Sequence, residues 1–284
     1  EKDLNCYCHN NIMALKFTTQ PLSHLEQKIY LLLESEGKNV FTVKDLKKLK
    51  LPMKYGHLRV ILHRLEKKGW ITSVRKGVYL RLPAAAAVEG KVYLEDPFDV
   101  ALKIFDGYLA FQSALRVHGI SEYQPFTIFV ATKNKSEQLN LLEQYEIRAI
   151  KLGKRYCGFQ KKNEYKVSSL AKTFFDCFSH PQHAGGYPEI LKSLHTCKEI
   201  DWDEFLSYFE KFASDSLCQK VGYLLSLLKE TDYKVPKRVI EYLRKRVRVK
   251  TRLVSKTKGG KLKKEWLVID NMGKKELLSW WLRG

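Results

Sequence analysis

Apolar residues recur at helical spacing in three stretches of the N-terminal quarter of the chain. In the third stretch Leu58, Ile61, Leu62 and Leu65 form one stripe, and Gly69 stands where the helix should end. Two stretches rich in β-branched and aromatic residues follow, joined by a Lys-Gly pair that is typical of a hairpin turn. This order of elements predicts a winged helix-turn-helix. The expected elements are helices at 21–36, 43–49 and 54–68, a short strand at 40–41, and hairpin strands at 70–74 and 78–82.

The pattern changes after residue 83, where an alanine-rich segment ending in Gly90 has the composition of a linker. Strand-like and helix-like stretches then alternate, and beyond Gly186 helical spacing dominates until two final strands around Lys258-Gly259-Gly260. We expect helices at 97–105, 108–117, 168–178, 188–197, 201–213, 215–230 and 235–246, a short helix holding Trp280 and Trp281, and strands at 126–130, 147–152, 156–159, 164–167, 247–254 and 262–269.

These elements predict an α+β protein with a winged helix-turn-helix, a mixed α/β region and a mainly helical, basic C-terminal region. A chain of 284 residues has room for two or three such domains. The first twelve residues precede Met13 and lack periodicity, so no helix or strand is predicted for them. The expected divisions are an N-terminal extension at 1–20, the winged helix-turn-helix at 21–83, the linker at 84–90, the mixed α/β domain at 91–187 and the helical domain with a terminal hairpin at 188–284.

Positive charge is concentrated in two blocks, although the whole chain carries a formal net charge of +20. Residues 38–81 contain 13 basic and 2 acidic residues, and residues 234–264 contain 14 basic and 1 acidic residue. Clustered Lys and Arg displace counterions from phosphates, so the blocks indicate a polyanionic partner, with nucleic acid favoured over an anionic membrane or an acidic protein. Six scattered cysteines, and no apolar run of membrane-spanning length or signal peptide, predict a soluble cytoplasmic protein.

The third helix of a winged helix enters the major groove, so its side opposite the apolar stripe should read DNA. Helical geometry also places Val60 on or near this outward face. Arginine can contact guanine bidentately or hold phosphate, whereas lysines of the preceding helix and the wing tip suit the backbone or the minor groove. A solvated face of a protein-interaction domain is the alternative. The expected DNA-binding residues are Lys44, Lys47, Lys48, Gly56, Arg59, His63, Arg64, Lys67, Arg75 and Lys76.

The second block carries Arg244, Arg246, Arg248, Lys250 and Arg252 at the end of a helix and the start of a strand. Alternation along the expected strand would put the last four of these cations on one face. Like charges on one face repel each other, so we expect an external partner there. The partner could be flanking DNA, RNA or an acidic protein surface. A solvated lysine-rich surface without a partner is the simpler alternative.

Four motifs in this order resemble the AbiEi family of antitoxins, which are type IV toxin–antitoxin transcriptional regulators. They are Gly77-Val78-Tyr79 in the wing, the Ser-Ala-Leu to His-Gly-Ile stretch 113–120, the Lys-Thr-Phe-Phe-Asp stretch 172–176 followed by Pro181 and Ala-Gly-Gly, and a late strand that contains Trp266. Ala171 stands where the family usually has Glu, so no role of that carboxylate carries over. The segment 234–264 is also more basic than is usual in the family.

The resemblance implies a repressor that binds inverted repeats in its own promoter through the winged helix. It also implies a C-terminal part that counters a nucleotidyltransferase-like toxin encoded by the neighbouring gene, with or without a stable complex. Two copies would be needed on a palindromic operator, either as a homodimer or as cooperating monomers. The alternatives are an enzyme acting on DNA, such as a nuclease, glycosylase or lyase, and a nucleic-acid-binding protein without sequence preference.

Three groups of residues have side chains that could carry chemistry. Lys172 and Asp176 are four residues apart on a helix, which fits a structural ion pair better than a Schiff-base lysine. The set Cys177, His180 and His183 and the set Cys6, Cys8 and His9 contain metal-ligand types but lack the second half of a zinc motif. His118 is expected to cap a helix end. We therefore predict no catalytic residue, no metal and no cofactor.

Overall fold

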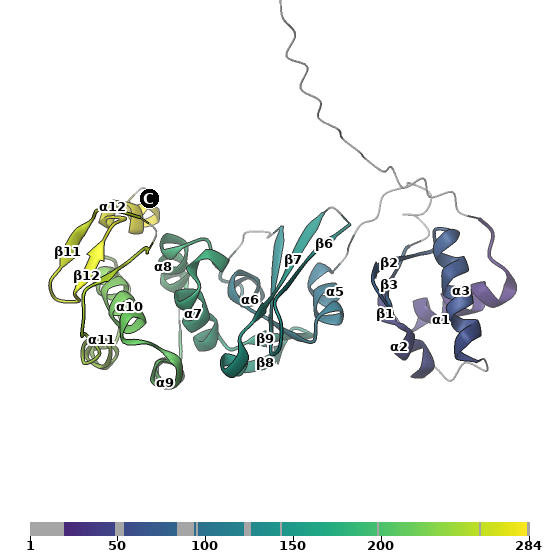
Figure 1. Cartoon of the computed structure of the whole chain (residues 1–284), viewed down its shortest axis with the longest axis horizontal. Coiled ribbons are helices and arrows are strands. Elements are labelled where there is room, and N and C mark those ends of the chain that lie inside the picture. The colour runs from purple at the N-terminus through teal and green to yellow at the C-terminus, as the bar shows by residue number, and fades with distance from the viewer. Residues whose placement is uncertain are drawn as a thin grey trace, which may run out of the picture. The chain divides into compact units, whose positions relative to one another are not determined.

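The computed structural model describes residues 20–48, 54–83, 94, 96–121, 126–142, 144–197, 199–255 and 257–282. The chain divides into two compact units, residues 1–96 and 97–284 (Figure 1). Helices and three separate sheets are present, which confirms the α+β class. The described helices include none with the length and apolar character that crossing a lipid bilayer requires. The expected linker 84–90, residues 1–19 of the expected extension, and the Cys6, Cys8 and His9 group lie outside the described residues.

The N-terminal unit has the element order predicted from its apolar pattern. Its three strands form an antiparallel sheet in the order β1-β3-β2, and Gly77 allows the tight turn between β2 and β3 with a φ of 80°. Ser23 and Glu26 form a capping box at the start of α1, and Thr42 pairs with Asp45 at the start of α2. The elements are α1 His24–Ser35, β1 Val40–Thr42, α2 Val43–Lys48, α3 Tyr55–Lys67, β2 Ile71–Arg75 and β3 Val78–Arg81.

The core of this unit is the stripe that the sequence predicted. Leu58, Ile61, Leu62 and Leu65 of α3 are all buried and belong to one cluster with residues of α1, β1 and α2. Because one side of α3 is committed to this cluster, its opposite side faces solvent. The packing therefore fixes which α3 side chains can reach a ligand.

The second unit is built around a six-stranded mixed sheet in the order β6-β7-β5-β4-β9-β8 (Figure 1). The helix expected at 108–117 is wrong in its first part, because residues 107–109 form β4 and the helix begins at Phe111. A Cβ atom on Gly107 would lie 2.1 Å from the carbonyl oxygen of Ala131, so glycine permits the close pairing of β4 with β5. The strands are β4 Gly107–Leu109, β5 Thr127–Thr132, β6 Glu137–Leu141, β7 Tyr145–Lys151, β8 Phe159–Lys162 and β9 Tyr165–Ser168.

Helices account for most of the remaining chain. Ser169, Asp201 and Ser214 cap the N-terminal ends of α7, α9 and α10. A single buried cluster runs from Tyr108 to Leu278, across the domain boundary that the sequence placed after residue 187; that subdivision remains a prediction. The helical elements are α5 Pro97–Ile104, α6 Phe111–Val117, η1 Gly153–Arg155, α7 Leu170–Ser179, η2 Pro181–His183, α8 Tyr187–Thr196, α9 Trp202–Phe212, α10 Asp215–Leu227, η3 Leu228–Glu230, α11 Lys237–Arg244, α12 Lys274–Leu277 and α13 Ser279–Leu282.

The C-terminal strands differ from the predicted hairpin. The strand expected at 247–254 is reduced to β10, Thr251–Arg252, which pairs in parallel with β12, Val268–Asp270. The strand expected at 262–269 is split into β11, Lys261–Lys263, and β12 by a tight turn in which Leu267 has a φ of 49°. The turn brings Trp266 into the core. Burial of the large indole side chain stabilises the fold more than a continuous strand would.

Trp266 packs directly on α10. Its side chain is 1% exposed, and a Cβ atom on Gly222 would lie 2.1 Å from the indole ring. Glycine in the middle of a helix normally costs about 1 kcal/mol relative to alanine. Its place here is explained by the space that the ring occupies.

We predict that Gly222→Ala destabilises the second unit by about 1–3 kcal/mol, because overpacking against Trp266 exceeds the gain in helix propensity. Thermal unfolding followed by near-UV circular dichroism measures this change. Gly56→Ala in α3 is the control, because nothing lies within 4 Å of its new Cβ atom. A Gly222→Ala variant as stable as the parent would contradict the packing argument.

Candidate nucleic-acid interface

The outward face of α3 presents the side chains that the helical period predicted. Arg59, His63, Arg64 and Lys67 are exposed, as is Gly56 near the start of the helix. Val60 lies on the same face and is 46% exposed, which is unusual for a β-branched apolar side chain on a helix with a well-formed buried stripe. The face therefore combines cationic donors with one apolar contact.

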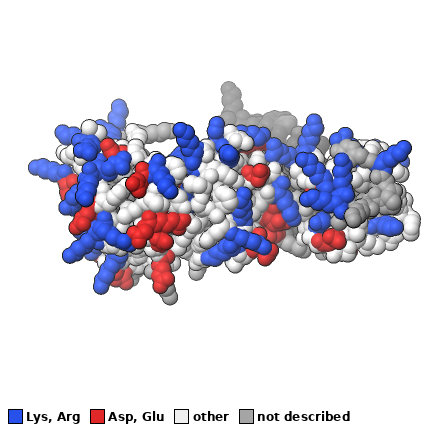
Figure 2. Space-filling view, turned by 90° about the horizontal axis from the view of Figure 1, so that it is seen from below, with Lys and Arg blue, Asp and Glu red and all other residues white. Residues whose placement is uncertain are grey.

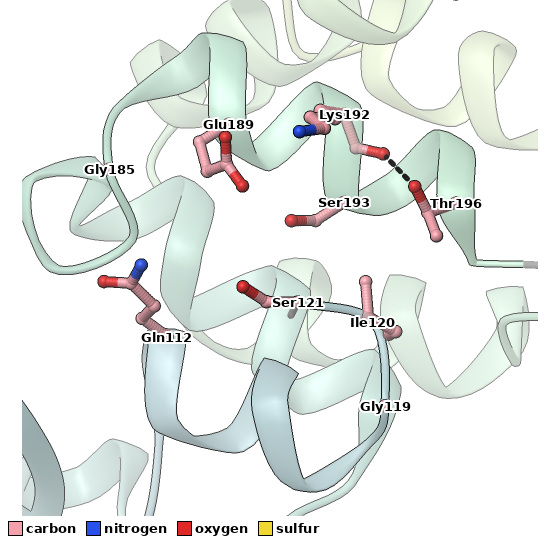
Figure 3. A pocket seen from close by; sticks show the side chains of 9 residues that line it. All are labelled: Gln112, Gly119, Ile120, Ser121, Gly185, Glu189, Lys192, Ser193 and Thr196. Atoms are coloured by element: carbon pink, nitrogen blue, oxygen red, sulfur yellow. Dashed lines mark hydrogen bonds between the residues drawn. The ribbon is translucent and has the colours of Figure 1, made fainter. Parts of the chain in front are cut away.

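The neighbouring elements of the N-terminal unit add further cations. Lys44, Lys47 and Lys48 of α2 are exposed, and so is Lys76 at the turn between β2 and β3, whereas Arg75 is half-buried. Figure 2 shows Lys and Arg side chains gathered on this unit with few Asp or Glu among them. All ten residues expected to contact DNA thus lie in the described part of the chain, and nine of them are exposed.

The second basic surface is partly neutralised by the protein itself. Arg244 forms an ion pair with Glu265, and Arg246 pairs with Asp215. Arg252 donates to the carbonyl oxygen of Gly259 at 3.0 Å. The expected ladder of four cations along one strand face is therefore wrong, because Arg246, Arg248 and Lys250 precede β10 and lie in irregular backbone.

Arg248 and Lys250 remain exposed, and neither has an acidic side chain within 4.0 Å among the residues that the structure describes. The amide of Gln219, a wholly buried side chain of α10, holds the segment that carries them. It donates to the carbonyl oxygens of Val249 at 2.8 Å and Trp266 at 2.9 Å, and its oxygen accepts the amide of Arg248. This role of Gln219 is not visible in the sequence, because a single polar residue on an apolar helix carries no signal of its distant partners.

Lys172 and Asp176 form a buried ion pair on α7, with both side chains 0% exposed. Burial raises the pKa of the Asp176 carboxyl, and the adjacent Lys172 ammonium opposes this increase. The lysine also lies 5.8 Å from the ring centres of Phe175 and Tyr208. An amine enclosed in this way offers no accessible nucleophile to a sugar aldehyde, so the pair has the geometry of a structural ion pair.

The histidines make packing contacts and hydrogen bonds within the second unit. His118 lies at the end of α6, where its Nε2 atom is 2.8 Å from the carbonyl oxygen of Ser168, and burial lowers its pKa. His180 and His183 stack with their ring centres 6.0 Å apart, while Cys177 is wholly buried in the core. In the described ranges, no three His, Cys, Asp or Glu side chains are placed to hold a metal ion.

Comparisons with known proteins find a matching family model and a solved structure with a similar fold. Residues 28–81 match the model of transcriptional regulators described as AbiEi antitoxins. The crystal structure of the RV2827C protein from Mycobacterium tuberculosis is similar with a TM-score of 0.64 over 92% of this chain and 95% of that chain, at 13% sequence identity. This likeness shows a shared fold alone. No curated protein matches the sequence.

The family match covers α3 and both strands of the hairpin, whereas the motifs noted at 113–120 and 172–186 and around Trp266 lie outside the matched residues. The N-terminal unit of this chain thus matches the AbiEi antitoxin family of transcriptional regulators, which confirms the resemblance seen in the sequence.

Proposed function

We propose that this protein is a sequence-specific DNA-binding regulator that represses its own promoter and counters a toxin. The observation that carries the proposal is the cationic outward face of α3, on an element order typical of a winged helix-turn-helix and within the residues that match the AbiEi regulators. No catalytic step is part of the proposal. The regulator and antitoxin role follows the family, while the DNA contacts come from the exposed residues themselves.

In the proposed complex α3 enters the major groove. Arg59 and Arg64 contact guanine edges or phosphates, and His63 donates to or accepts from a base. The lysines of α2 hold the backbone on one side, and Arg75 and Lys76 of the wing reach the backbone or the minor groove on the other. An inverted-repeat operator then takes two copies of the chain, with half-sites about 10 bp apart or a multiple of that distance.

Antitoxin activity is assigned to the C-terminal part, against a nucleotidyltransferase-like toxin. Two of the five expected residues of the second basic surface support this assignment best. Arg248 and Lys250 are available to a partner, whereas Arg244 and Arg246 already have carboxylates of the chain beside them. A contact to flanking DNA or to RNA by the same two residues is the competing assignment.

We predict that Arg59→Ala and Arg64→Ala each weaken operator binding about 5- to 150-fold, since a lost bidentate base contact costs about 1–3 kcal/mol. Lys47→Ala should weaken binding to all duplexes alike and reduce the salt slope by about 1. Fluorescence anisotropy on the upstream region and on unrelated duplex, at several salt concentrations, separates the two effects. Lys28→Ala, on the exposed side of α1, serves as the control. Unchanged affinity in all three variants would place the interface elsewhere.

We also predict that Val60 contacts the methyl group of a thymine. Replacing each operator thymine in turn by deoxyuridine removes that methyl group alone, and one such replacement should weaken binding of the parent several-fold. In Val60→Ala the same replacement should have no further effect. If the deoxyuridine replacement weakens operator binding of Val60→Ala as much as it weakens binding of the parent protein, the contact is contradicted. A parent protein that binds no operator duplex would contradict DNA readout altogether.

For the C-terminal part we predict that Arg248→Ala with Lys250→Ala abolishes growth rescue from the toxin and leaves operator affinity within about twofold, because both residues lie outside the N-terminal unit. Lys229→Ala with Lys275→Ala is the charge-matched control, since both lysines are exposed on the same unit. Rescue assays and operator anisotropy are run on each variant. Loss of operator binding with intact rescue would reverse the assignment and favour flanking DNA.

A further inference from the structure

A cavity of about 350 Å³ opens in the second unit. It lies where η1, the end of α7, the start of α8, the end of α9 and the first turns of α10 meet. Phe178, Tyr187 and Phe212 supply apolar walls. No Asp or Glu is among the residues that line it. Its polar lining consists of Arg155, Ser179, His180, Ser214, Ser216 and Lys220.

The two cations of this cavity lack a carboxylate partner of the kind that some partly buried cations have elsewhere in the protein. Arg81 pairs with Glu34, and Lys68 pairs with Glu26. Neither Arg155 nor Lys220 has a carboxylate oxygen within 4.0 Å among the described residues. Burial lowers the pKa of Lys220, which is the penalty expected for an ammonium that has lost water without gaining an anion.

Buried Asp176 is the carboxylate that Arg155 affects electrostatically, because the guanidinium lowers the pKa of that carboxyl. Asp176 forms its ion pair with Lys172 instead. Arg155 therefore keeps hydrogen-bonding capacity for a ligand on its cavity side.

Further donors line the same space. The Arg155 guanidinium donates to Nε2 of His180 at 3.4 Å, and burial lowers the pKa of His180 to about 4. The ring is therefore neutral near pH 7 and carries its proton on Nδ1, which is buried and has no partner among the described residues. Ser214 accepts the amide of Leu217 at the start of α10, so its own hydroxyl proton can be donated. The lining thus supplies two cations and the Ser214 hydroxyl without a competing acid.

We propose that this cavity binds the phosphate group of a small phosphate monoester such as a nucleoside 5′-monophosphate. Arginine provides a fork that matches two phosphate oxygens, and lysine provides a point charge. The N-terminal end of the thirteen-residue helix α10 adds a favourable dipole. A volume of about 350 Å³ is larger than one phosphate needs and leaves room for the sugar and for a base against Phe212.

The first test is isothermal titration calorimetry of the full chain with inorganic phosphate and with adenosine and guanosine 5′-monophosphate, at constant ionic strength set by chloride. We expect saturable binding that becomes at least 10-fold weaker in Arg155→Met and in Lys220→Met. Lys229→Met, on an exposed part of the same unit, should bind as the parent does. No saturable binding of any of the three probes, or equal affinity in all variants, would overturn the proposal.

A second measurement uses the unaltered protein, so it does not depend on the folding of a variant. Acetylation by acetic anhydride is followed at individual lysines by mass spectrometry with and without adenosine 5′-monophosphate. Lys220 should be modified several-fold more slowly with the ligand, while exposed Lys229 should be unaffected. Equal rates at Lys220 would contradict the site. Operator binding is measured on the same samples, so that failure of this site is distinguished from failure of the DNA-binding function.

Discussion

The second unit depends on the burial of Trp266 against α10. Gly222 removes the one side chain that would collide with the ring, and Gln219, less than one turn earlier, binds the carbonyl oxygen of Trp266 and that of Val249. One helix therefore positions both the C-terminal sheet and the irregular segment that carries Arg248 and Lys250. Because the buried amide of Gln219 would be costly to leave unpaired, the path of the basic segment is fixed by hydrogen bonding more than by strand pairing.

The two basic blocks have different physical characters. On α3 the apolar stripe is wholly buried and the cations on the opposite face are directed to solvent, whereas Lys68 and Arg81 of the same block pair with Glu26 and Glu34. In the C-terminal block, Glu265 and Asp215 come from other parts of the chain and neutralise Arg244 and Arg246. The two blocks contain similar numbers of basic residues, so a count alone does not distinguish them. The tertiary structure leaves the α3 cations of the first block exposed, and it reduces the second block to a smaller exposed surface around Arg248 and Lys250.

Sequence patterns failed where a long-range contact decided the local structure. The stretch before Phe111 has helical spacing, yet Gly107–Leu109 pairs with β5 because glycine allows the backbones to approach. Strand β6, Glu137–Leu141, was missed because it is a polar edge strand with little apolar alternation. The hairpin expected near the C-terminus became three short strands once Trp266 entered the core.

The sequence by itself determined the helices, caps and hairpin turn of the N-terminal unit, since these depend on contacts between residues near each other in the chain. It also identified the outward residues of α3, because a helical period relates exposure directly to position. Only the tertiary structure decided which cations of the C-terminal block have a carboxylate beside them. It also decided that Lys172 is enclosed and that Arg155 and Lys220 line one cavity. Electrostatic interaction depends on the distance between charges in space. Arg155 and Lys220 are 65 positions apart in the chain, and no periodic pattern in the sequence indicates that they line the same cavity.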